Sequence, residues 1–416
     1  MAELDLTALA RAAEARIAAL AACSAPGPGV TRLPFTPEHR AARADLTAQM
    51  EAAGLTVRED AAGTLIGRIE GPTGAPTLLM GSHQDSVREG GAYDGIMGVV
   101  LPILALETLL DQDVALPFAV EVLAFADEEG VRFPTALIGP RALAGSFDPT
   151  VLDMADADGI SLRDALSGFG LDPDAISGLA RDPATVLGYV ETHIEQGPVL
   201  EAAGDPLGVV TAICGIERHP VAFRGETGHA GTLPMEMRRD ALVGAAALIT
   251  EVDRLAQATP GLLGTIGTLV LTPGAVNAVP REARLTVELR APEDAVREAA
   301  GAALTDFARQ TAAARSLTLD MTRSYHQAAT PCDPALSDRL AKAVETVTGA
   351  PASRLASGAT HDASAMADLC PVAMLFTRCA GGVSHRPEEA ASGADMARAV
   401  AALVAFLTAP DWSTPR

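Results

Sequence analysis

Histidine and acidic residues recur in short glycine-containing segments, each next to an apolar run of the sequence. The segments are residues 81–87 (GSHQDSV), 91–95 (GAYDG), 127–130 (DEEG), 193–197 (HIEQG) and 382–385 (GVSH). Imidazole together with carboxylate suits borderline and hard divalent metal ions. A spare carboxylate beside a metal carboxylate suits a general base that activates water. The pattern therefore predicts a hydrolase that uses two metal ions.

The composition is that of a globular protein of more than one domain. The chain has 416 residues, of which 48% are hydrophobic, and this length is too great for one ordinary core. Its formal net charge of −22 disfavours nucleic acid and anionic membrane surfaces as partners. The charge does not fix the sign of a small substrate, which could be an anion in a locally positive cleft.

The cysteines and the chain start both indicate the cytoplasm. The five cysteines are odd in number and form no CxxC pair, so we expect buried free thiols and no disulfide framework. The first residues, MAELD, are acidic and do not resemble a signal peptide. No charge-free apolar stretch reaches about 18 residues, which excludes a predicted membrane span.

The chemistry-bearing residues must be positioned by an α/β fold. Helical spacing over 3–22 and 37–53 is followed by short apolar strands that alternate with helical patterns, as in a largely parallel sheet. His83, the Glu128–Glu129 pair, His193 and His385 each follow one of these strands, at 77–80, 118–125, 187–190 and 372–376. Open α/β sheets bind ligands beyond the carboxyl ends of their strands. We therefore expect these side chains at one sheet edge.

The middle of the chain follows a different pattern. Residues 211–327 read as strand, helix, strand, strand, helix, strand, which predicts a small α+β sandwich. His385 lies beyond this insert yet belongs with His83, so the catalytic domain must be discontinuous. The predicted parts are 1–210 and 328–416 for the catalytic domain and 211–327 for the insert.

These motifs resemble the dinuclear-metal amidohydrolases of the hydantoinase/carbamoylase type, which are relatives of aminoacylases and metallo-exopeptidases. The resemblance runs from Thr31-Arg32-Leu33 to the region of Ser384-His385. It implies a mostly parallel metallo-exopeptidase-like domain with an inserted lid and dimerisation domain, and two divalent ions, Zn or Mn, with Co or Ni also compatible. The implied metal ligands are His83, Asp94, Glu129, His193 and His385, with Asp94 bridging the two ions.

The resemblance also implies roles around the metals. Glu128 is the implied general base, and Asp85 is expected to hydrogen-bond the other ring nitrogen of His83. His229 is expected to stabilise an oxyanion from the partner subunit of a homodimer. The implied substrate-binding residues are Gln196, His229, Asn277, Arg290, Gly358 and His361. Arg290 suits a bidentate grip on a substrate carboxylate, and Gln196 a ureido amide.

The HIEQG form at His193 is typical, by resemblance, of enzymes that cut N-carbamoyl groups, because peptidase relatives usually carry a carboxylate there. The expected substrate is a ureido acid, which would yield ammonia and carbon dioxide. Allantoate is the first choice, from the wording around Val131–Pro134; an N-carbamoyl-L-amino acid is second and an aminoacylase or dipeptidase substrate third. Gly228, Leu233 and Val131 depart from the usual pattern and leave the choice of ureido compound open.

Two less specific interpretations compete with these roles. A lone histidine is more often structural than a ligand, and His39, His219 and His326 are predicted to be surface or loop residues. Arg290 could be only a salt-bridge partner, and Asn277 could belong to an ordinary turn. A non-catalytic metal-binding scaffold on the same fold would be expected to lack Glu128 or a ligand, and this sequence retains both.

Overall fold

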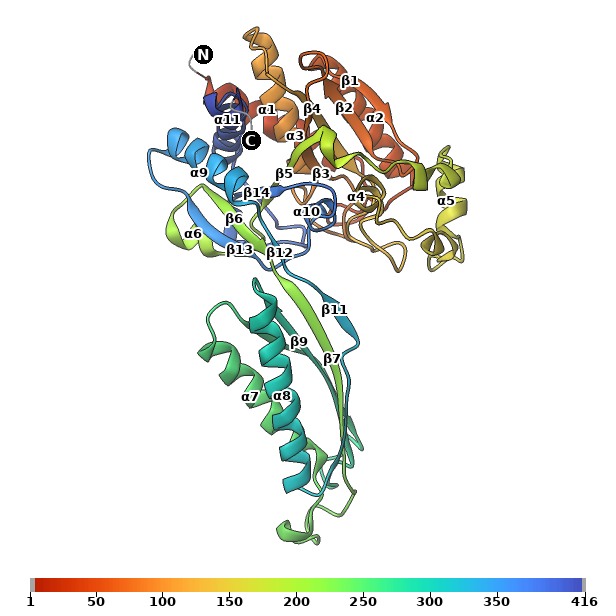
Figure 1. Cartoon of the computed structure of the whole chain (residues 1–416). Helices are drawn as coiled ribbons and strands as arrows, with labels where there is room; N and C mark the ends of the chain where they lie inside the picture. Colours follow the sequence, from red (N-terminus) through yellow and green to blue (C-terminus); the bar gives the residue numbers. More distant parts are fainter. Residues whose placement is uncertain (1–3, 414–416) are drawn as a thin grey trace. The chain divides into compact units, whose positions relative to one another are not determined.

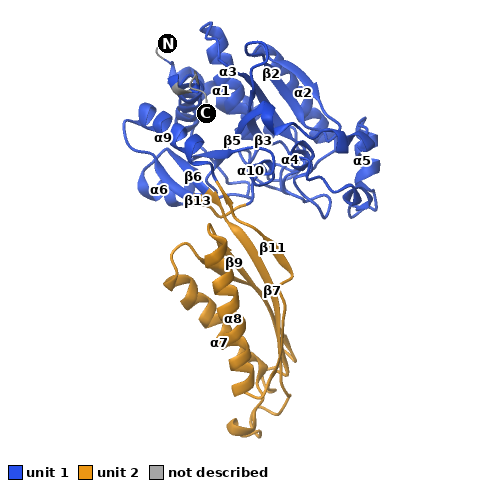
Figure 2. Ribbon diagram, in the orientation of Figure 1, with its two compact units in different colours: residues 1–211, 332–355, 360–416 blue, residues 212–331, 356–359 orange. Residues whose placement is uncertain are grey.

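The chain divides into two compact units in the computed structural model, which describes residues 4–413 (Figures 1 and 2). Unit 1 comprises residues 1–211, 332–355 and 360–416, and unit 2 comprises residues 212–331 and 356–359. Unit 1 is thus discontinuous in sequence and unit 2 is essentially one inserted run. Within residues 4–413, no helix is both long and apolar enough to cross a membrane.

The larger sheet has four parallel strands at its centre. Its strand order is β1-β2-β4-β3-β5-β14-β6-β12, with β13 also paired to β6. The neighbouring pairs β3–β4, β3–β5 and β5–β14 are parallel, whereas the flanking pairs on both sides are antiparallel. The strands are β1 (Thr56–Glu59), β2 (Leu65–Ile69), β3 (Thr77–His83), β4 (Ala119–Phe125), β5 (Val186–Ile194), β6 (Leu207–Ile213), β12 (Thr330–Pro331), β13 (Ser353–Ser357) and β14 (Val372–Thr377).

The central strands are apolar because helices and loops cover them. Every residue of β3, β4 and β14 is buried, as expected for strands packed on both faces. The α-helices of this unit are α1 (Leu6–Ala21), α2 (Pro37–Ala52), α3 (Ile96–Asp111), α4 (Ile138–Ala144), α5 (Leu162–Phe169), α6 (Val199–Ala203), α9 (Pro334–Thr348), α10 (Asp362–Met366) and α11 (Gly393–Leu407). Short 3₁₀ turns lie at Pro149–Asp153, Pro173–Gly178, Pro183–Thr185, Ala380–Gly382 and Pro410–Ser413.

Local sequence explains where several of these helices begin. Thr36 caps α2 through the amide of His39, and Pro37 occupies the first helical position, where no amide is needed. Asp333 and Ser392 cap α9 and α11 in the same way. The side chains of α1, α2, α3, α9 and α11 then join one hydrophobic core with the central strands.

Unit 2 is an antiparallel sheet with two helices on one face. The strand order is β10-β7-β9-β8, with β11 also paired to β7. Its elements are β7 (Gly215–Arg224), α7 (Ala241–Ala258), β8 (Leu263–Thr272), β9 (Glu282–Ala291), α8 (Asp294–Ala314), β10 (Thr318–Met321), β11 (Tyr325–Gln327) and a 3₁₀ turn at Met235–Met237. Strand β9 alternates buried and partly exposed residues because only one of its faces packs on α7 and α8.

The predicted α/β fold, with a parallel sheet and a separate antiparallel one, is confirmed. The prediction was wrong for two histidines, because His39 in α2 and His219 in β7 are buried, while His326 is exposed as expected. His39 Nδ1 accepts a hydrogen bond from the amide of Phe35 (2.8 Å), and the ring stacks on Phe169, so one ring nitrogen and the ring face are both used within the fold. All five cysteines are free, and Cys23 alone is only partly buried.

Candidate metal centre

Two histidines reach the centre from the ends of neighbouring parallel strands. His83 is the last residue of β3, and His193 is the penultimate residue of β5. Strand β3 extends three residues past the predicted end at Met80, because Gly81, Ser82 and His83 remain paired with β4. Both histidines therefore lie within the strands, at the carboxyl edge where ligand sites of parallel sheets form.

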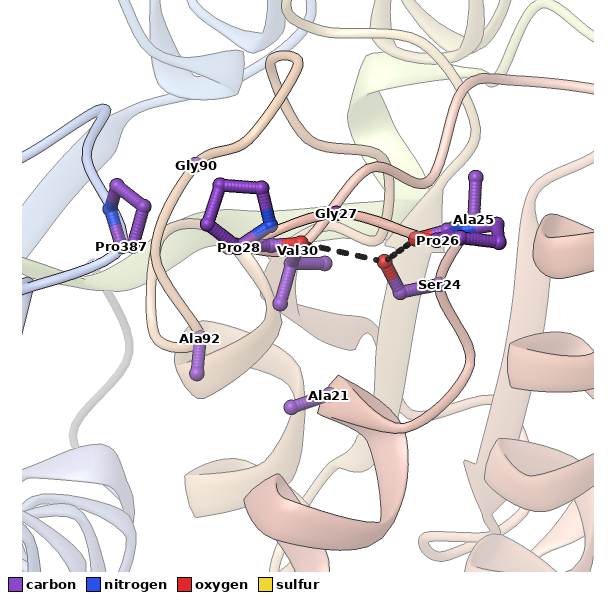
Figure 3. A pocket seen from close by; sticks show the side chains of 11 residues that line it. Ala21, Ser24, Ala25, Pro26, Gly27, Pro28, Val30, Gly90, Ala92 and Pro387 are labelled. Atoms are coloured by element: carbon purple, nitrogen blue, oxygen red, sulfur yellow. Dashed lines mark hydrogen bonds between the residues drawn. The ribbon is translucent and has the colours of Figure 1, made fainter.

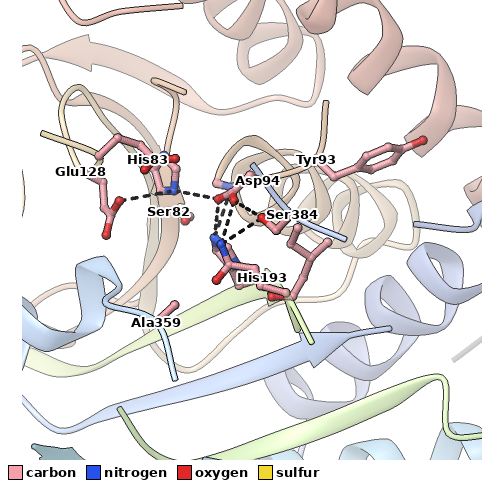
Figure 4. A network of polar contacts seen from close by, with 12 residues as sticks. Ser82, His83, Tyr93, Asp94, Glu128, His193, Ala359 and Ser384 are labelled. Atoms are coloured by element: carbon pink, nitrogen blue, oxygen red, sulfur yellow. Dashed lines mark hydrogen bonds and ion pairs between the residues drawn. The ribbon is translucent and has the colours of Figure 1, made fainter. Parts of the chain in front are cut away.

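Asp94 lies beside His83 and His193 (Figure 4), and it also faces a third histidine, His385. Its Oδ1 is 3.1 Å from His193 Nε2 and 3.4 Å from His83 Nε2. Its Oδ2 is 3.3 Å from His385 Nε2. One carboxylate oxygen thus faces two imidazoles and the other faces a third, which is the arrangement expected of a bridging ligand.

Glu128 and Glu129, which follow β4, each lie near a different histidine of this arrangement. Glu129 Oε1 is 3.6 Å from His385 Nε2, and Glu128 Oε2 is 4.0 Å from His83 Nε2. The ligand atoms of Asp94, Glu129 and His385 all lie within 4.8 Å of one another, as do those of His83, Asp94 and His193. These two three-residue groups share Asp94, and within residues 4–413 the ligand atoms of His83, Glu128 and Glu129 form a third group of the same size.

Three residues around this arrangement have positive φ angles. Gly95 has φ +66°, and a Cβ atom there would be 2.3 Å from the His83 ring, so no other residue fits. Gln196 and His385 both have φ +58°, an unfavourable conformation for non-glycine residues. Backbone strain of this kind is typical of residues at functional sites.

The ring nitrogens that face away from Asp94 are held by the backbone. His193 Nδ1 lies 2.9 Å from the Ile194 carbonyl, and His83 Nδ1 lies 3.1 Å from the Asp85 carbonyl. Such contacts fix the tautomer and leave Nε2 to face a metal. The expected contact of Asp85 with His83 is thus made by its carbonyl at hydrogen-bonding distance, with the carboxylate Oδ1 at 3.4 Å from Nδ1.

The carboxylate of Asp85 has a further contact that the sequence did not suggest. Its two oxygens accept hydrogen bonds from the amides of Glu128 (3.1 Å) and Glu129 (3.2 Å). Asp85 is fully buried, so these bonds are shielded from water. The loop after β3 thereby fixes the loop after β4, and with it both adjacent carboxylates.

The electrostatics of the cluster favour cations. Burial opposes protonation of His83, yet Asp85, Asp94 and Glu128 together raise its pKa well above the usual value. Hydrogen bonding to Asp94 raises the pKa of His385 to about 9. Burial, and then the charge of Asp94, raise the pKa of Glu129 to about 7. The local field is therefore strongly negative, which is the field that attracts a divalent cation.

The donor set fits two divalent metal ions. Glu129 Oε1 is buried and has no hydrogen-bond partner in the part of the chain that the structure describes. A buried carboxylate oxygen is seldom left without a partner, and a metal would supply one. His83, His193 and Asp94 Oδ1 would hold one ion, and Asp94 Oδ2, Glu129 and His385 the other. Nitrogen and carboxylate oxygen ligands suit Zn, Mn, Co or Ni.

Two further predicted residues line the same centre. Gln196 Nε2 donates to Asp94 Oδ2 (2.8 Å) and to Ser384 Oγ (3.2 Å), so its amide lies beside the shared carboxylate. His361 is buried, and its ring packs edge-on against His193 with centroids 4.6 Å apart. Burial, with the charge of His193, holds the pKa of His361 well below its usual value. A neutral His361 can both donate and accept hydrogen bonds.

Glu191 is a nearby acidic residue that the sequence reasoning missed. It is fully buried in β5, two residues before His193, and could form a fourth ligand group with His193 and His361. Its oxygens already accept hydrogen bonds from Ser82 Oγ (2.7 Å) and the amide of Ala363 (2.9 Å). Glu191 therefore supports the His361 segment. Its position on a strand among apolar residues was the signal that could have identified it.

The remaining predicted residues lie in unit 2. Residues 228–230 pair with 277–279 through the bridge of His229 with Ala278, so His229 and Asn277 are carried on neighbouring segments, and both are exposed. Arg290 donates to Glu288 Oε1 (2.8 Å) and to the Gly358 carbonyl (2.6 Å). The structure thus brings Arg290 and Gly358 together within this unit.

A separate cavity of about 370 Å³ lies beside the loop that leads to Asp94 (Figure 3). It is lined by the Pro- and Gly-rich segment after α1, by Gly90 and Ala92, and by Pro387. None of its lining residues is charged, and Ser24 Oγ is engaged with the carbonyls of Ala25 and Gly29. This cavity therefore offers no ionisable side chain for catalysis.

Comparison with known proteins gives one consistent result. Residues 79–409 match the model of peptidase family M20/M25/M40. The chain is 41% identical to an N-carbamoyl-L-amino acid amidohydrolase of Geobacillus stearothermophilus, over 89% of this chain and 91% of that protein. It is 39% identical to a probable allantoate deiminase of Oryza sativa subsp. japonica, over 90% of this chain and 83% of that protein. A hydantoinase/carbamoylase family amidase from Burkholderia multivorans superposes with a TM-score of 0.89 at 31% identity, over 97% of both chains.

Proposed function

Because this chain belongs to the M20/M25/M40 peptidase family and resembles its carbamoyl-hydrolysing members, we propose that it is a dinuclear metal-dependent amidohydrolase of ureido acids. The observation that carries the proposal is the shared Asp94. Its two oxygens face two groups of ligands, and Glu128 stands beside one of them. We place the enzyme in the cytoplasm.

The proposed chemistry divides between the metals and Glu128. Two divalent ions would polarise the ureido carbonyl and promote ionisation of the attacking water. Glu128 takes the proton from that water and delivers it to the leaving nitrogen. Glu128 suits this role because burial raises the pKa of its carboxyl well above the usual value. The products are ammonia, carbon dioxide and the amine that carried the carbamoyl group.

The substrate we propose is a ureido compound that carries a carboxylate, with allantoate first and N-carbamoyl-L-amino acids second. The relatives support both, since their names include allantoate deiminase and N-carbamoyl-L-amino acid amidohydrolase. We propose that Arg290, Asn277 and Gly358 of unit 2, with Gln196 and His361, contact this substrate. Arg290 supplies the positive charge for the carboxylate.

A panel assay tests the substrate class. Ammonia release is measured from allantoate and from several N-carbamoyl-L-amino acids, with Zn, Mn, Co or Ni added to chelator-treated protein. N-acyl amino acids and dipeptides are assayed for amine release in parallel, and Glu128→Gln is the inactive control. Ureido acids should be the best substrates. Faster cleavage of an acyl amino acid or a dipeptide would contradict the proposal.

We propose that unit 2 is a lid and that it forms a homodimer. Strand β8 lies at the edge of its sheet and exposes apolar side chains, with Leu263 at 57% and Val270 at 60%. An exposed apolar edge strand is suited to pairing with a second copy, and twofold symmetry is the commonest arrangement. His229 is proposed to act on the metal centre of the partner subunit.

Subunit mixing tests this role of His229. Two inactive variants, Glu128→Gln and His229→Ala, are given different tags, mixed and isolated as mixed dimers. One site of each mixed dimer then has an intact Glu128 and an intact partner histidine, so part of the activity should return. The control pair is Glu128→Gln with His385→Ala, which should stay inactive because both residues serve the same chain's centre. Mixed dimers as inactive as their parents would show that His229 does not act across the interface.

A further inference from the structure

Glu389 lies four residues after His385, in the loop that leads into α11, and no role has been assigned to it above. Only 4% of its surface is exposed. Its Oε1 accepts hydrogen bonds from the amides of Tyr93 (2.9 Å) and Asp94 (3.0 Å). Its Oε2 lies 3.1 Å from Ser384 Oγ. A single buried carboxylate thus joins the segment of Asp94 to the segment of His385.

These contacts fix both the backbone and the side chain of Asp94. The two amides orient the two peptide groups that precede the Asp94 Cα atom. Ser384 Oγ also lies 2.9 Å from Asp94 Oδ2, so the carboxylate itself is tied to the same segment (Figure 4). Gly91 makes room for this arrangement, because a Cβ atom there would be 2.1 Å from Glu389 Oε1.

The partners of Glu389 differ from those of an ordinary surface acid. Within residues 4–413, no Lys or Arg forms an ion pair with it, and its hydrogen bonds go to two amides and a hydroxyl. Its neighbour Glu388 shows the usual case, since it is 64% exposed and pairs with Arg386. The charge of Glu389 therefore adds to the negative field at Asp94, while its oxygens set the geometry.

We propose that Glu389 is a positioning residue that holds the shared Asp94 in register with His385. The proposal rests on the two-ion centre proposed above. The pairing of β3 with β4 fixes His83, and the pairing of β5 with β14 fixes His193; neither pairing depends on Glu389. His385 lies in a loop, and only the contacts of that loop determine where it stands relative to Asp94 Oδ2. Loss of Glu389 should therefore weaken the ion of Asp94, Glu129 and His385 more than the ion of His83 and His193.

The test is a metal titration of the full-length, chelator-treated protein with Mn²⁺ or Zn²⁺, followed by calorimetry. The wild type should bind two ions per chain. Glu389→Ala should weaken one of them by about 10- to 100-fold, the usual effect of losing an outer partner of a ligand, and should weaken the other, which shares Asp94, by less. The metal affinity of Glu389→Gln should lie between those of the wild type and Glu389→Ala. The glutamine oxygen can still accept both backbone amides, and its NH₂ group can donate to Ser384. Glu388→Gln is the matched control and should titrate like the wild type.

The outcomes separate the two proposals. A wild type that binds one ion or none would overturn the two-ion centre itself. A wild type that binds two ions, with Glu389→Ala titrating identically or losing both ions equally, would overturn only the role of Glu389. If Glu389→Ala does not fold, Gly91→Ala gives the same test, because the added Cβ displaces the Glu389 carboxylate without removing it. A Gly91→Ala protein with two unchanged affinities would also overturn the role.

Discussion

Replacing Asp85 with Asn should impair the metal centre although Asp85 is not among the proposed ligands. Its Oδ1 accepts the amide of Glu128 and its Oδ2 accepts the amide of Glu129, each from within the protein core. An asparagine keeps one acceptor oxygen and turns an NH₂ group toward the other amide. One of the two hydrogen bonds must therefore be lost, and a donor then faces a donor.

The expected size of the effect follows from the loss of one hydrogen bond. A hydrogen bond to a charged group contributes about 1.5–3 kcal/mol, which corresponds to about 10- to 150-fold in an equilibrium. Because the lost bond positions Glu128 or Glu129, the loss should appear in the metal affinity, in kcat, or in both. The assays are metal titration of chelator-treated protein and ammonia release from the best ureido acid.

Asp60 offers a matched control. It is also a buried aspartate that accepts two backbone amides, those of Ala62 (2.9 Å) and Thr64 (3.0 Å), in the turn between β1 and β2. Both bonds go to the same oxygen, so an asparagine can keep them, and none of the proposed ligands depends on them. Asp60→Asn should bind metal and turn over normally. The reasoning is refuted if Asp85→Asn matches the wild type, or if Asp60→Asn loses metal affinity to the same extent.

Three further outcomes are expected. Glu128→Gln should keep both metal ions and lose at least about 100-fold in kcat, whereas Glu129→Gln should lose metal, as metal analysis and kinetics of each variant would show. Chelation should abolish activity and added Mn or Zn should restore it; an active preparation with one ion per chain or none would exclude two-metal catalysis. Burial, with nearby arginine charge, lowers the pKa of His39 to about 3. Below about pH 6.5 the unfolded chain therefore binds a proton that the folded chain does not, and the free energy of unfolding decreases as the pH falls, by about 2 kcal/mol from pH 7 to pH 5. Denaturation of metal-free protein followed by the fluorescence of Trp412, the single tryptophan, should show a smaller pH dependence in His39→Gln, and equal dependence would exclude His39 as the cause.

The sequence predicted the fold well because the alternation of strands and helices is a local pattern, and the structure brings the candidate ligand side chains together. Apolar strands followed directly by His83 or His193 indicate the carboxyl edge of a parallel sheet, whatever the rest of the chain does. The antiparallel strands on either side of the four central ones were not predicted, since pairing partners far apart in the chain leave no local signal. The residue roles stay predictions, while the family and the fold are confirmed.

The supporting contacts could not be read from the sequence for a physical reason. Asp85 and Glu389 act through backbone amides, and an amide has no sequence signature of its own. His39 was misjudged because it lies in a helix of polar composition, where only the three-dimensional contact with Phe169 shows that it is buried. Such residues become visible when the loops that they join are placed side by side.

The inserted position of unit 2 has a consequence for biosynthesis. Residues 212–331 form one continuous run. Strand β14, which pairs with β5 in the sheet that also contains β3, comes after this run, and so does His385. During translation domains fold as units, in the order in which they leave the ribosome. The insert is therefore fully synthesised while the metal centre still lacks a strand and a histidine. A chain that stalls between residues 359 and 372 carries a complete insert and a catalytic unit that still lacks β14 and His385, so only the last part of synthesis supplies the third histidine of the candidate centre.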